Sequence, residues 1–319
     1  MTSSIDIVIV NWNAGPQLAQ CLESIAAASR TGLHVQRIVV VDNASSDSSL
    51  PPADVAGLPV TVIRNKQNRG FARACNQGAL GSMAAYLLFL NPDTSLLTDS
   101  LAQPVDFMER EGNQRIGIVG VQLLDSDGRI ARTCARFPTP GRFFSQMLGL
   151  DRALPSLFPA HFMVEWDHRQ SREVDQVMGA FFLIRRPLFE ALGGFDERFF
   201  VYFEEVDLSL RARVLGWRTF YLSTAHAYHH GSEQVKKRMQ PARLFYSLRS
   251  RILYAYKHFS PSTATLVTLG TLFLEPVSRL VIAIARRSPS QLAETVKAYA
   301  LLWRAVPGRL RVARPADDR

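Results

Sequence analysis

Short apolar runs alternate along this chain with segments in which apolar residues recur at every third or fourth position. Apolar runs bounded by polar residues are typical of buried strands, and the recurrent spacing is typical of helices with one buried face. The first strand is expected at residues 5–10. A helix that opens at Gly15-Pro16 follows it, since proline is tolerated in the first helical turn. The apolar face of this helix consists of Leu18, Cys21, Leu22 and Ile25.

The same alternation continues to about residue 222. Further strands are expected at residues 38–41, 60–63, 87–90, 116–121, 181–184 and 218–222. Further helices are expected at residues 72–79, 99–110, 187–192 and 204–215. This order predicts an α/β fold with a mostly parallel sheet flanked by helices. Residues 132–172 have weak periodicity, so they are expected to form an irregular insertion, as a loop on the acceptor side of a site.

Two of the apolar runs lead into an aspartate. Residues 38–41 precede Asp42, and residues 86–90 precede Asn91-Pro92-Asp93. Ligands of open α/β sheets bind beyond the carboxyl ends of the strands, so the two aspartates together indicate a site for a nucleotide and a metal. For either aspartate alone, the alternative is a cap on the helix or turn that follows.

Composition excludes several classes of protein. The chain has 319 residues, of which 47% are hydrophobic, and this is enough for a large core. Its three cysteines are far apart and form no CxxC pair, which argues against a disulfide framework or a zinc site and favours a reducing cytosol. The first residues lack the basic and apolar regions of a signal peptide, so secretion is not expected.

The positive charge of the chain is confined to its C-terminal part. Residues 236–319 hold 16 Lys and Arg against 4 Asp and Glu, whereas residues 1–235 hold 21 against 24. A basic segment predicts an anionic partner, either nucleic acid or a membrane surface. Because no zinc-finger spacing or RNA-binding signature is visible, and because the charges are mixed with apolar stretches, an anionic membrane surface is expected and nucleic acid is not.

This C-terminal part is expected to be a helical extension of a catalytic domain at residues 1–235. Residues 259–274 carry no charge, but they are too few to span a bilayer, which takes about 20 residues, and Glu275, Pro276 and Arg279 interrupt the apolar run. Apolar stripes with arginine-rich flanks are typical of helices that lie in the plane of a membrane surface. The alternative is that these helices pack on the catalytic domain. One such stripe consists of Leu292, Val296, Tyr299 and Trp303.

Three carboxylates, Glu204, Glu205 and Asp207, stand at the start of an expected helix, where the helix dipole favours their ionised form. Asp207 and Arg211 are four residues apart and are expected to form an ion pair. Glu205 lies on a different side of the helix and is the freer candidate for a general base. The alternative is a solvated acidic first turn.

Three histidines, His226, His229 and His230, follow the last expected strand. Their spacing is not a known zinc signature. If Asp93 lies opposite them, the group predicts a site for Mn²⁺ or Mg²⁺ shared with a diphosphate.

Seven short motifs occur in an order that resembles the family 2 glycosyltransferases, especially their rhamnosyltransferase-like and galactofuranosyltransferase-like members. The resemblance covers about residues 5–230, and its specificity lies in the ordered set. The motifs are IVIVNWN at 7–13, VDNASSD at 41–47, NRGFA at 68–72, NPD at 91–93, GAF at 179–181, GGFDE at 193–197 and YFEEVDL at 202–208.

The resemblance implies a GT-A fold, a Rossmann-like mixed sheet flanked by helices, and an inverting transfer of a sugar from a nucleotide-diphosphate donor that needs a divalent cation, Mg²⁺ or Mn²⁺. It implies Asp93 and His229 as metal ligands, and Glu205 as the catalytic base, with Asp207 counted in the same catalytic motif. The chain departs from the family pattern at the metal motif, which has one carboxylate, and at the base, which is Glu instead of the commoner Asp. The residues implied to bind the donor are Val10, Asn11, Asn13, Asp42, Asn68, Gly70 and Asp93.

Other enzyme classes fit less well. The turn after the first strand lacks the GxGxxG of a dehydrogenase, and no glycine-rich loop with a basic residue indicates a nucleotidyltransferase. A catalytically silent scaffold that docks at a membrane is the main alternative, since a fold alone does not determine function. The expected donor is dTDP-rhamnose, with a UDP- or GDP-sugar as the alternative. The expected acceptor is a lipid-linked saccharide or cell-surface polysaccharide, reached from the cytoplasmic face of the cell membrane; the oligomeric state is left open.

Overall fold

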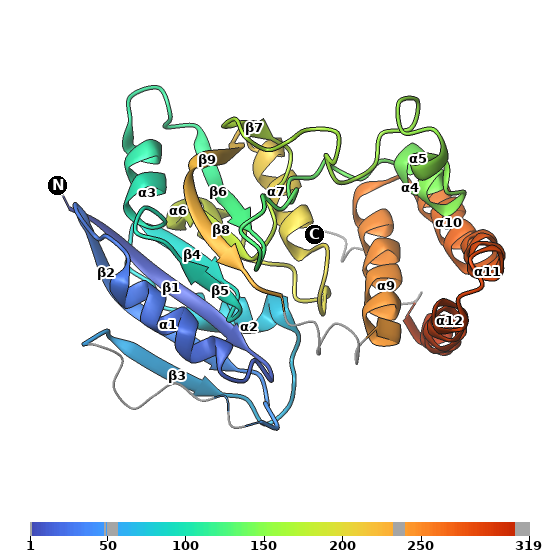
Figure 1. Cartoon of the computed structure of the whole chain (residues 1–319), viewed down its shortest axis with the longest axis horizontal. Helices are drawn as coiled ribbons and strands as arrows, with labels where there is room; N and C mark the ends of the chain where they lie inside the picture. Colours follow the sequence, from blue (N-terminus) through green and yellow to red (C-terminus); the bar gives the residue numbers. More distant parts are fainter. Residues whose placement is uncertain (1, 48, 50–56, 232–239, 310–319) are drawn as a thin grey trace, which may run out of the picture. The chain divides into compact units, whose positions relative to one another are not determined.

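The computed structural model describes residues 2–47, 49, 57–231 and 240–309, which form two compact units (Figure 1). The first unit comprises Met1–Phe137, Phe162–Phe200 and Glu204–Ser232. The second comprises Pro138–His161, Val201–Phe203 and Glu233–Arg319. The expected domain boundary, between residues 235 and 236, lies outside the described residues.

The first unit is built on one mixed sheet with the strand order β3-β2-β1-β4-β8-β6-β9-β5, and β7 pairs with β9 beside it. Strands β1 to β4 run parallel, whereas β8 runs antiparallel to both of its neighbours, β4 and β6. The strands are β1 Ser3–Asn11, β2 Leu33–Asp42, β3 Val60–Arg64, β4 Tyr86–Leu90, β5 Thr94–Leu96, β6 Ile116–Leu124, β7 Arg172–Val174, β8 Phe181–Arg185 and β9 Arg218–His229.

Helices cover both faces of this sheet, because its central strands are apolar on both sides. Along β1, Ile7 and Ile9 pack with one buried cluster, which includes the apolar face of α1, and Val8 packs with a second cluster that includes α2 and α7. The alternation follows from the period of two residues in a strand. The helices are α1 Gln17–Ala27, α2 Phe71–Ala79, α3 Ala102–Glu109, α6 Arg186–Ala191 and α7 Glu204–Val214.

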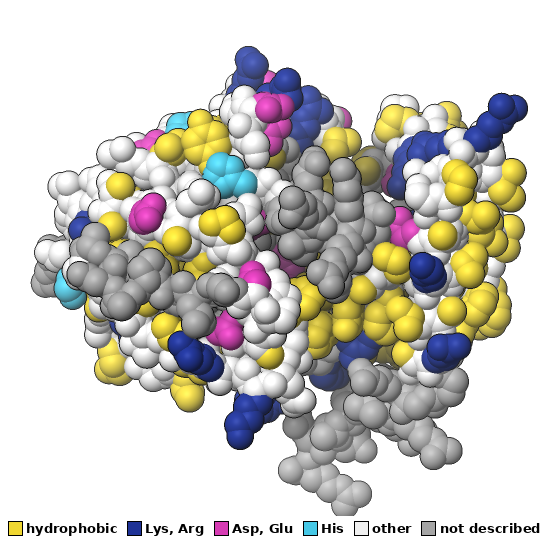
Figure 2. All heavy atoms as spheres, turned by 60° about the horizontal axis from the view of Figure 1, so that its bottom comes forward, with side chains coloured by type: hydrophobic (Ala, Val, Ile, Leu, Met, Phe, Trp, Pro, Cys, Tyr) yellow, Lys and Arg dark blue, Asp and Glu magenta, His cyan; other side chains and the backbone are white. Residues whose placement is uncertain are grey.

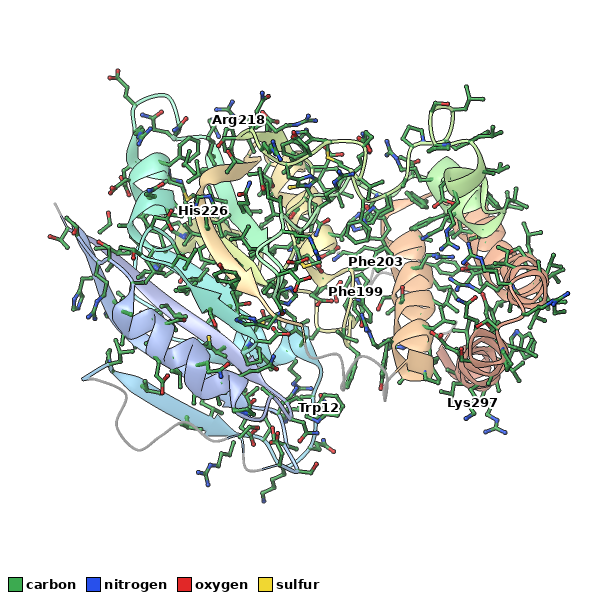
Figure 3. All side chains as sticks on the ribbon, viewed as in Figure 1. Trp12, Phe199, Phe203, Arg218, His226 and Lys297 are labelled. Atoms are coloured by element: carbon green, nitrogen blue, oxygen red, sulfur yellow. The ribbon has the colours of Figure 1, made fainter. Side chains whose placement is uncertain are left out.

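The last strand is longer than the sequence pattern predicts. Residues 218–222 are expected to form it, but β9 continues to His229. The extension pairs with β6, whose register shifts after Val121 so that residues 122–124 stay paired with 226–228. The sequence pattern predicted that His226 and His229 follow the last strand, but both lie within it. Figure 3 labels Arg218 and His226 on this strand.

The prediction of an irregular insertion at 132–172 is wrong for part of that segment. It contains two helices, α4 Pro140–Met147 and α5 Leu150–Ala153. The hydroxyl of Thr139 accepts a hydrogen bond from the amide of Arg142 (3.2 Å), and proline occupies the first helical turn. This is a favourable start for a helix, and the apolar face of α4 packs within the second unit instead of on the sheet.

The second unit is helical. Its longest apolar helix runs without a break from Pro261 to Ala285 and includes a π-turn. The sequence analysis expected Glu275 and Pro276 to interrupt this apolar segment, but the helix continues through both residues. By length and composition this helix could cross a membrane, and 44% of its most apolar window is buried. The helices of this part are α9 Gln240–His258, α10 Pro261–Leu269, η1 Gly270–Leu274, α11 Glu275–Ala285 and α12 Pro289–Arg309.

A buried ion-pair network explains how the long helix accommodates a carboxylate. Glu275 and Arg251 are 1% and 4% exposed and pair with each other across α11 and α9. Arg279 also donates to Glu275 (2.8 Å), and Arg251 donates to Gln146 of α4 (3.0 Å). Burial raises the pKa of Glu275, but the attraction of Arg251 and Arg279 prevails and lowers it. Breaking a buried pair of this kind costs about 3–5 kcal/mol, so the network ties three helices together.

Candidate active site

The ends of β1 and β2 meet at the carboxyl edge of the sheet, as the parallel pairing requires. Asn11 and Asp42 are register partners, and both are buried. The side-chain amide of Asn11 donates to Asp42 (3.0 Å) and to the carbonyl of Ser49 (2.7 Å). Asn11 thus orients the Asp42 carboxylate. The resemblance implies that both residues bind the donor, and this stays a prediction.

Asn13 shapes the loop that faces this edge. Its φ is 54°, a left-handed conformation that Asn tolerates better than most residues. Its side-chain oxygen accepts hydrogen bonds from the amides of Ser46 (2.7 Å) and Asp47 (3.2 Å). These contacts assign Asn13 a role in holding the loop at 45–47. Val10, the preceding strand residue implied to bind the donor, is buried within the second apolar cluster.

Asn68 and Gly70 form a turn around Asn43, a residue that the sequence reasoning did not single out. Asn68 accepts hydrogen bonds from the side chain of Asn43 (2.9 Å) and from the amide of Gly70 (2.9 Å). Gly70 has a φ of 87°, and a Cβ there would lie 2.6 Å from the carbonyl oxygen of Phe200. Glycine is therefore required, because the turn closes directly against residue 200. The amide of Phe71 donates to the same carbonyl (2.6 Å).

The three histidines have three different partners. His229 Nε2 lies 3.3 Å from an oxygen of Asp93, whereas His226 pairs with Asp99 (2.9 Å) and His230 contacts Ser95 (3.2 Å). His226 and His229 are three residues apart on a strand, so they point to opposite faces. Of the three imidazole rings, that of His229 is the one paired with the Asp93 carboxylate, as the resemblance implies, and His230 donates only its backbone amide to the carbonyl of Asp93 (3.0 Å).

The Asp93–His229 pair fits a divalent cation of the Mn²⁺ or Mg²⁺ type. Neighbouring ligands of an octahedral cation with bonds of about 2.1 Å lie about 3 Å apart, close to the separation of these two atoms. Carboxylate oxygen and imidazole nitrogen are both ligands for such ions. The part of the chain that the structure describes holds no group of three or more His, Cys, Asp or Glu side chains suited to a metal. A diphosphate and water would have to complete the coordination.

The two glutamates at the start of α7 lie in unequal surroundings. Glu204 is 4% exposed, and burial, with the neighbouring charge of Glu205, raises its pKa well above the usual value. Glu205 is half-buried, and burial also raises its pKa, against hydrogen bonds from backbone amides that include that of Gly179. Since Glu204 is the more strongly disfavoured as an anion, Glu205 is the better candidate for a base that must be ionised before it accepts a proton.

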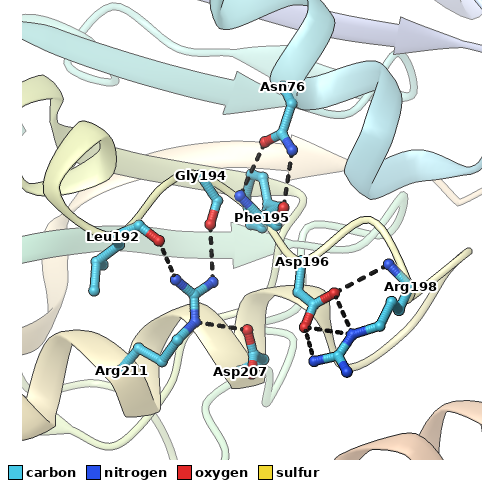
Figure 4. A network of polar contacts seen from close by, with 8 residues as sticks. All are labelled: Asn76, Leu192, Gly194, Phe195, Asp196, Arg198, Asp207 and Arg211. Atoms are coloured by element: carbon cyan, nitrogen blue, oxygen red, sulfur yellow. Dashed lines mark hydrogen bonds and ion pairs between the residues drawn. The ribbon is translucent and has the colours of Figure 1, made fainter. Parts of the chain in front are cut away.

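Asp207 forms the ion pair that its spacing predicts. Arg211 donates to it (2.8 Å) and also to the carbonyls of Leu192 (2.6 Å) and Gly194 (2.8 Å), as Figure 4 shows. Asp207 is fully buried and holds Arg211 against the turn that leads from α6 to α7. These contacts support a positioning role, and its place among the catalytic residues stays a prediction.

The backbone at residues 179–180, just before β8, joins the two ends of the site. The carbonyl of Ala180 accepts hydrogen bonds from the amide of Asn91 (3.0 Å) and from the hydroxyl of Thr94 (3.3 Å). A Cβ on the preceding residue, Gly179, would lie 3.9 Å from the carboxylate of Glu205. The turn that carries Asp93 and the start of α7 therefore flank the same two residues. The sequence reasoning noticed their motif but assigned them no role.

Comparison with known proteins agrees with this geometry. A family model described as "Glycosyl transferase family 2" matches residues 6–193. The chain belongs to glycosyl transferase family 2. It is therefore a glycosyltransferase, and the family resemblance of its motifs is confirmed.

Curated proteins that are similar to this chain include two rhamnosyltransferases. An N-acetylglucosaminyl-diphospho-decaprenol L-rhamnosyltransferase of Mycobacterium tuberculosis is 29% identical over 247 residues, which cover 72% of this chain and 77% of that protein. Rhamnosyltransferase WbbL of Escherichia coli is 29% identical over 148 residues, which cover 46% of this chain and 52% of that protein.

Solved structures of glycosyltransferases share the fold. The mannosyltransferase PcManGT from Pyrobaculum calidifontis, in complex with GDP-Man and Mn²⁺, is similar with a TM-score of 0.54 and 16% identity, over 97% of this chain and 78% of that one. TarS 1–349 of S. aureus, in complex with UDP-GlcNAc, gives a TM-score of 0.55 at 14% identity, over 97% and 83%. The predicted GT-A fold of this glycosyltransferase is confirmed.

We predict that Asp93→Ala removes the metal-dependent part of donor binding, because this carboxylate and His229 are the pair that fits the cation. Donor affinity is measured by calorimetry with and without Mn²⁺. Asp99→Ala is the matched control, because Asp99 pairs with His226, which lies on the same strand as His229. This substitution should leave the metal dependence of donor binding intact. Metal-dependent binding that persists in Asp93→Ala would contradict the assignment.

We predict that Glu205→Gln lowers turnover by about 10²-fold or more and leaves donor affinity nearly unchanged, as loss of a general base does. In the unaltered enzyme the base works only when ionised, so the rate falls as pH falls through the pKa of Glu205. Since burial raises that pKa, this acid limb lies above pH 4.5, the ordinary value for Glu. Steady-state rates across pH check both points. An inactive Glu204→Gln beside a fully active Glu205→Gln would exchange the two roles.

Proposed function

We propose that this glycosyltransferase transfers rhamnose, with inversion, from a nucleotide-diphosphate donor to a hydroxyl of a lipid-linked saccharide. The observation that carries this proposal is the convergence of the Asp93–His229 pair and Glu205 on residues 179–180. A site for a diphosphate and a base for an acceptor thus flank one short backbone segment. The two similar rhamnosyltransferases support rhamnose as the sugar.

The residues of the site divide the work of a single displacement. A divalent cation, when bound, neutralises the charge that develops on the departing diphosphate. Asp93 and His229 would hold this cation at the edge of the sheet. Glu205 removes the proton from the acceptor hydroxyl as that oxygen attacks the anomeric carbon, and one displacement inverts this carbon. Burial raises the pKa of Glu204 well above its usual value, so Glu205 is the favoured proton acceptor beside Gly179.

The nucleotide lies, in this proposal, along the ends of β1 and β2. Asn11, Asp42 and Asn43 present amide and carboxylate groups there, which suit the base and the ribose of a nucleotide. dTDP-rhamnose is the favoured donor, because the similar enzymes are rhamnosyltransferases and the family resemblance favours dTDP as the nucleotide. UDP- and GDP-sugars remain the competing donors.

The proposal of a lipid-linked acceptor is based on the mycobacterial relative, whose name includes a diphospho-decaprenol lipid. An enzyme that acts on a lipid-linked molecule has to reach a membrane surface, and the cytoplasmic face is the surface in this proposal. The helices of residues 236–319, with their excess of basic residues, are proposed to hold it there.

One face of the long helix offers a specific surface for this membrane contact. Six large apolar residues recur along it at helical spacing and are between 47% and 68% exposed. Figure 2 shows hydrophobic side chains gathered over the helical part at the right of the view, with Lys and Arg side chains among them. Glu275 lies on the opposite, protein-covered face, which favours a helix lying on the bilayer over one that spans it. The six residues, called the apolar stripe below, are Leu266, Leu269, Phe273, Val277, Val281 and Ile284.

The proposed activity is tested with purified protein, a panel of dTDP-, UDP- and GDP-sugars and prenyl-diphosphate-linked N-acetylglucosamine, with and without Mn²⁺. Metal-dependent transfer of rhamnose from dTDP-rhamnose is expected, with inverted configuration at the anomeric carbon by NMR. Transfer of another sugar would replace the donor assignment. Absence of turnover with every donor would favour the silent scaffold.

We predict that the protein sediments with anionic vesicles, more weakly as salt is raised, because each basic side chain near the surface contributes about 1 kcal/mol and salt screens that attraction. The apolar stripe is tested in the full chain with Leu266→Gln, Phe273→Gln and Val281→Gln together. A truncation after residue 231 is unsuitable, because residues 138–161 pack with the C-terminal helices.

The matched control replaces three apolar residues of the first unit that are even more exposed, Leu80, Met83 and Val214, by Gln. The stripe variant should lose sedimentation and the control should keep it. Equal sedimentation of both variants would remove the stripe from the proposal. Release that requires detergent at high salt would indicate a spanning helix.

A further inference from the structure

The turn at residues 192–195 follows α6, and the side chain of Asn76 in α2 holds its last residue. The oxygen of Asn76 accepts a hydrogen bond from the amide of Phe195 (2.9 Å), and its nitrogen donates to the carbonyl of the same residue (2.8 Å), as Figure 4 shows. Asparagine can make both bonds because its amide carries a donor and an acceptor, whereas an ionised aspartate of the same size carries acceptors alone. One side chain of α2 therefore fixes the backbone of Phe195.

The glycine before Phe195 fits closely against the same asparagine. Gly194 has a φ of 75°, and a Cβ there would lie 2.6 Å from the side-chain oxygen of Asn76. Only glycine allows this conformation together with so close an approach of the backbone. The amide of Gly194 also donates to the carbonyl of Phe189 in α6 (2.9 Å). The turn and Asn76 therefore match each other in conformation as well as in hydrogen bonding.

The ring of Phe195 is buried against the central sheet. It lies 4.9 Å from the ring of Phe89 and 6.0 Å from that of Phe182, measured between ring centroids. Phe89 belongs to β4, which leads into the turn that carries Asp93, and Phe182 belongs to β8, which follows residues 179–180. Aromatic pairs of this kind contribute about 0.5–1.5 kcal/mol beyond the area that they bury. Phe195 is thus fixed on the two strands that border the site.

The helix that carries Glu205 is attached to the other side of this turn. Arg211 of α7 donates to the carbonyls of Leu192 (2.6 Å) and Gly194 (2.8 Å). Asp207, one helical turn earlier in α7, orients the guanidinium group for these bonds. The carbonyl of Gly194 is therefore held by α7 and the next residue by α2, and all of these groups belong to the first unit.

α2 is a firm support for the start of α7, because it packs tightly on the sheet and lies beside the two glutamates. At Gly78 a Cβ would collide with the side chain of Val8 in β1, so the helix and the strand are in direct contact. Burial raises the pKa of the Cys75 thiol well above its usual value, and the negative charges of Glu204 and Glu205 raise it further. The electrostatic effect agrees with the hydrogen bonds in linking α2 to the start of α7.

We propose that Asn76 is a positioning residue for the catalytic base. Asn76 fixes Phe195 on the sheet, and Arg211 ties α7 to the neighbouring carbonyl. The start of α7 is thereby held so that the Glu205 carboxylate stays beside Gly179. This inference rests on the proposed role of Glu205 as the base.

The test uses Asn76→Ala and Arg211→Lys in the full chain. The first removes both hydrogen bonds to Phe195, and the second keeps a positive charge beside Asp207 but loses the planar fork that reaches two carbonyls. Catalysis is sensitive to the placement of a reacting group, so kcat is expected to fall about tenfold or more in each variant. Donor affinity by calorimetry should stay within about twofold of the unaltered enzyme. The reason is that the hydrogen bonds of Asn76 to described residues go to Phe195 and Glu197, and not to the residues implied to bind the donor.

The kcat–pH profile adds a readout that a loss of stability alone would not change. In the unaltered enzyme burial raises the pKa of Glu205, and the rate falls as pH falls through that pKa. A carboxylate that leaves its buried place regains water, so its pKa falls and the acid limb moves to lower pH in both variants. The titratable groups beside Glu205, which are Glu204 of α7 and Cys75 of α2, are the same in every variant.

Two substitutions at the opposite edge of the sheet provide matched controls. Asn113→Ala removes another half-buried asparagine that donates to a carbonyl, that of Phe107 (2.7 Å). Arg185→Lys removes another arginine fork on two carbonyls, those of Ile116 (2.9 Å) and Met108 (2.7 Å). Both controls should keep kcat and the acid limb. Variants of the turn that are folded by thermal unfolding and match the controls in kcat and pH profile would overturn the proposal, as would a parallel loss of donor affinity.

The outcome is separable from the assignment of the base. If Glu205→Gln stays active, the proposed function fails at the base, and the positioning role of Asn76 fails with it. If Glu205→Gln is inactive while Asn76→Ala and Arg211→Lys behave as the controls, only the positioning role is wrong.

Discussion

The antiparallel course of β8 is the constraint on which the site depends. Parallel strands end at one edge of a sheet, and only an antiparallel strand inserted among them begins at that edge. Gly179 and Ala180, just before β8, therefore lie where β4 ends, and their backbone can bond both the turn after β4 and the start of α7. Without this insertion the carboxylates of Asp93 and Glu205 would have no common backbone segment to flank.

Buried carboxylates in this enzyme follow two different electrostatic patterns. Asp207 and Glu275 each pair with arginine, and the two arginines of the Glu275 network keep the pKa of that residue low. Glu204 and Glu205 have no ion pair among the described residues, and burial raises the pKa of both. Paired carboxylates hold elements together, whereas raised pKa values are typical of groups that exchange protons in catalysis. The contrast supports the division of roles between Asp207 and Glu205 within one helix.

The second unit does more than extend the chain beyond the catalytic fold. It includes residues 138–161 and 201–203 from the middle of the sequence, and the buried Arg251–Glu275 ion pair links helices within its core. The same helices expose the apolar stripe, and the hydroxyl of Ser250 in α9 donates to the carbonyl of Val201.

Local patterns in the sequence determined much of the fold. The apolar face of α1 and the end of β2 at Asp42 are as predicted, because each depends on a periodicity that a few neighbouring residues carry. The i, i+4 pair of Asp207 with Arg211 is present for the same reason. The family motifs also placed Asp93 and His229 together, although spacing alone left three histidines as candidates.

The tertiary structure decided what depends on partners distant in the sequence. The extension of β9 to His229 follows from a register shift in β6, and the separate partners of the three histidines follow from it. The unbroken helix through Glu275 requires Arg251, and α4 requires the second unit as a surface on which to bury its apolar face. Asn43 and Ala180 form hydrogen bonds with residues far along the chain, Asn68 and Asn91 respectively. A local pattern records which face of an element is apolar, but it does not record which distant group will satisfy a buried charge or hydrogen bond.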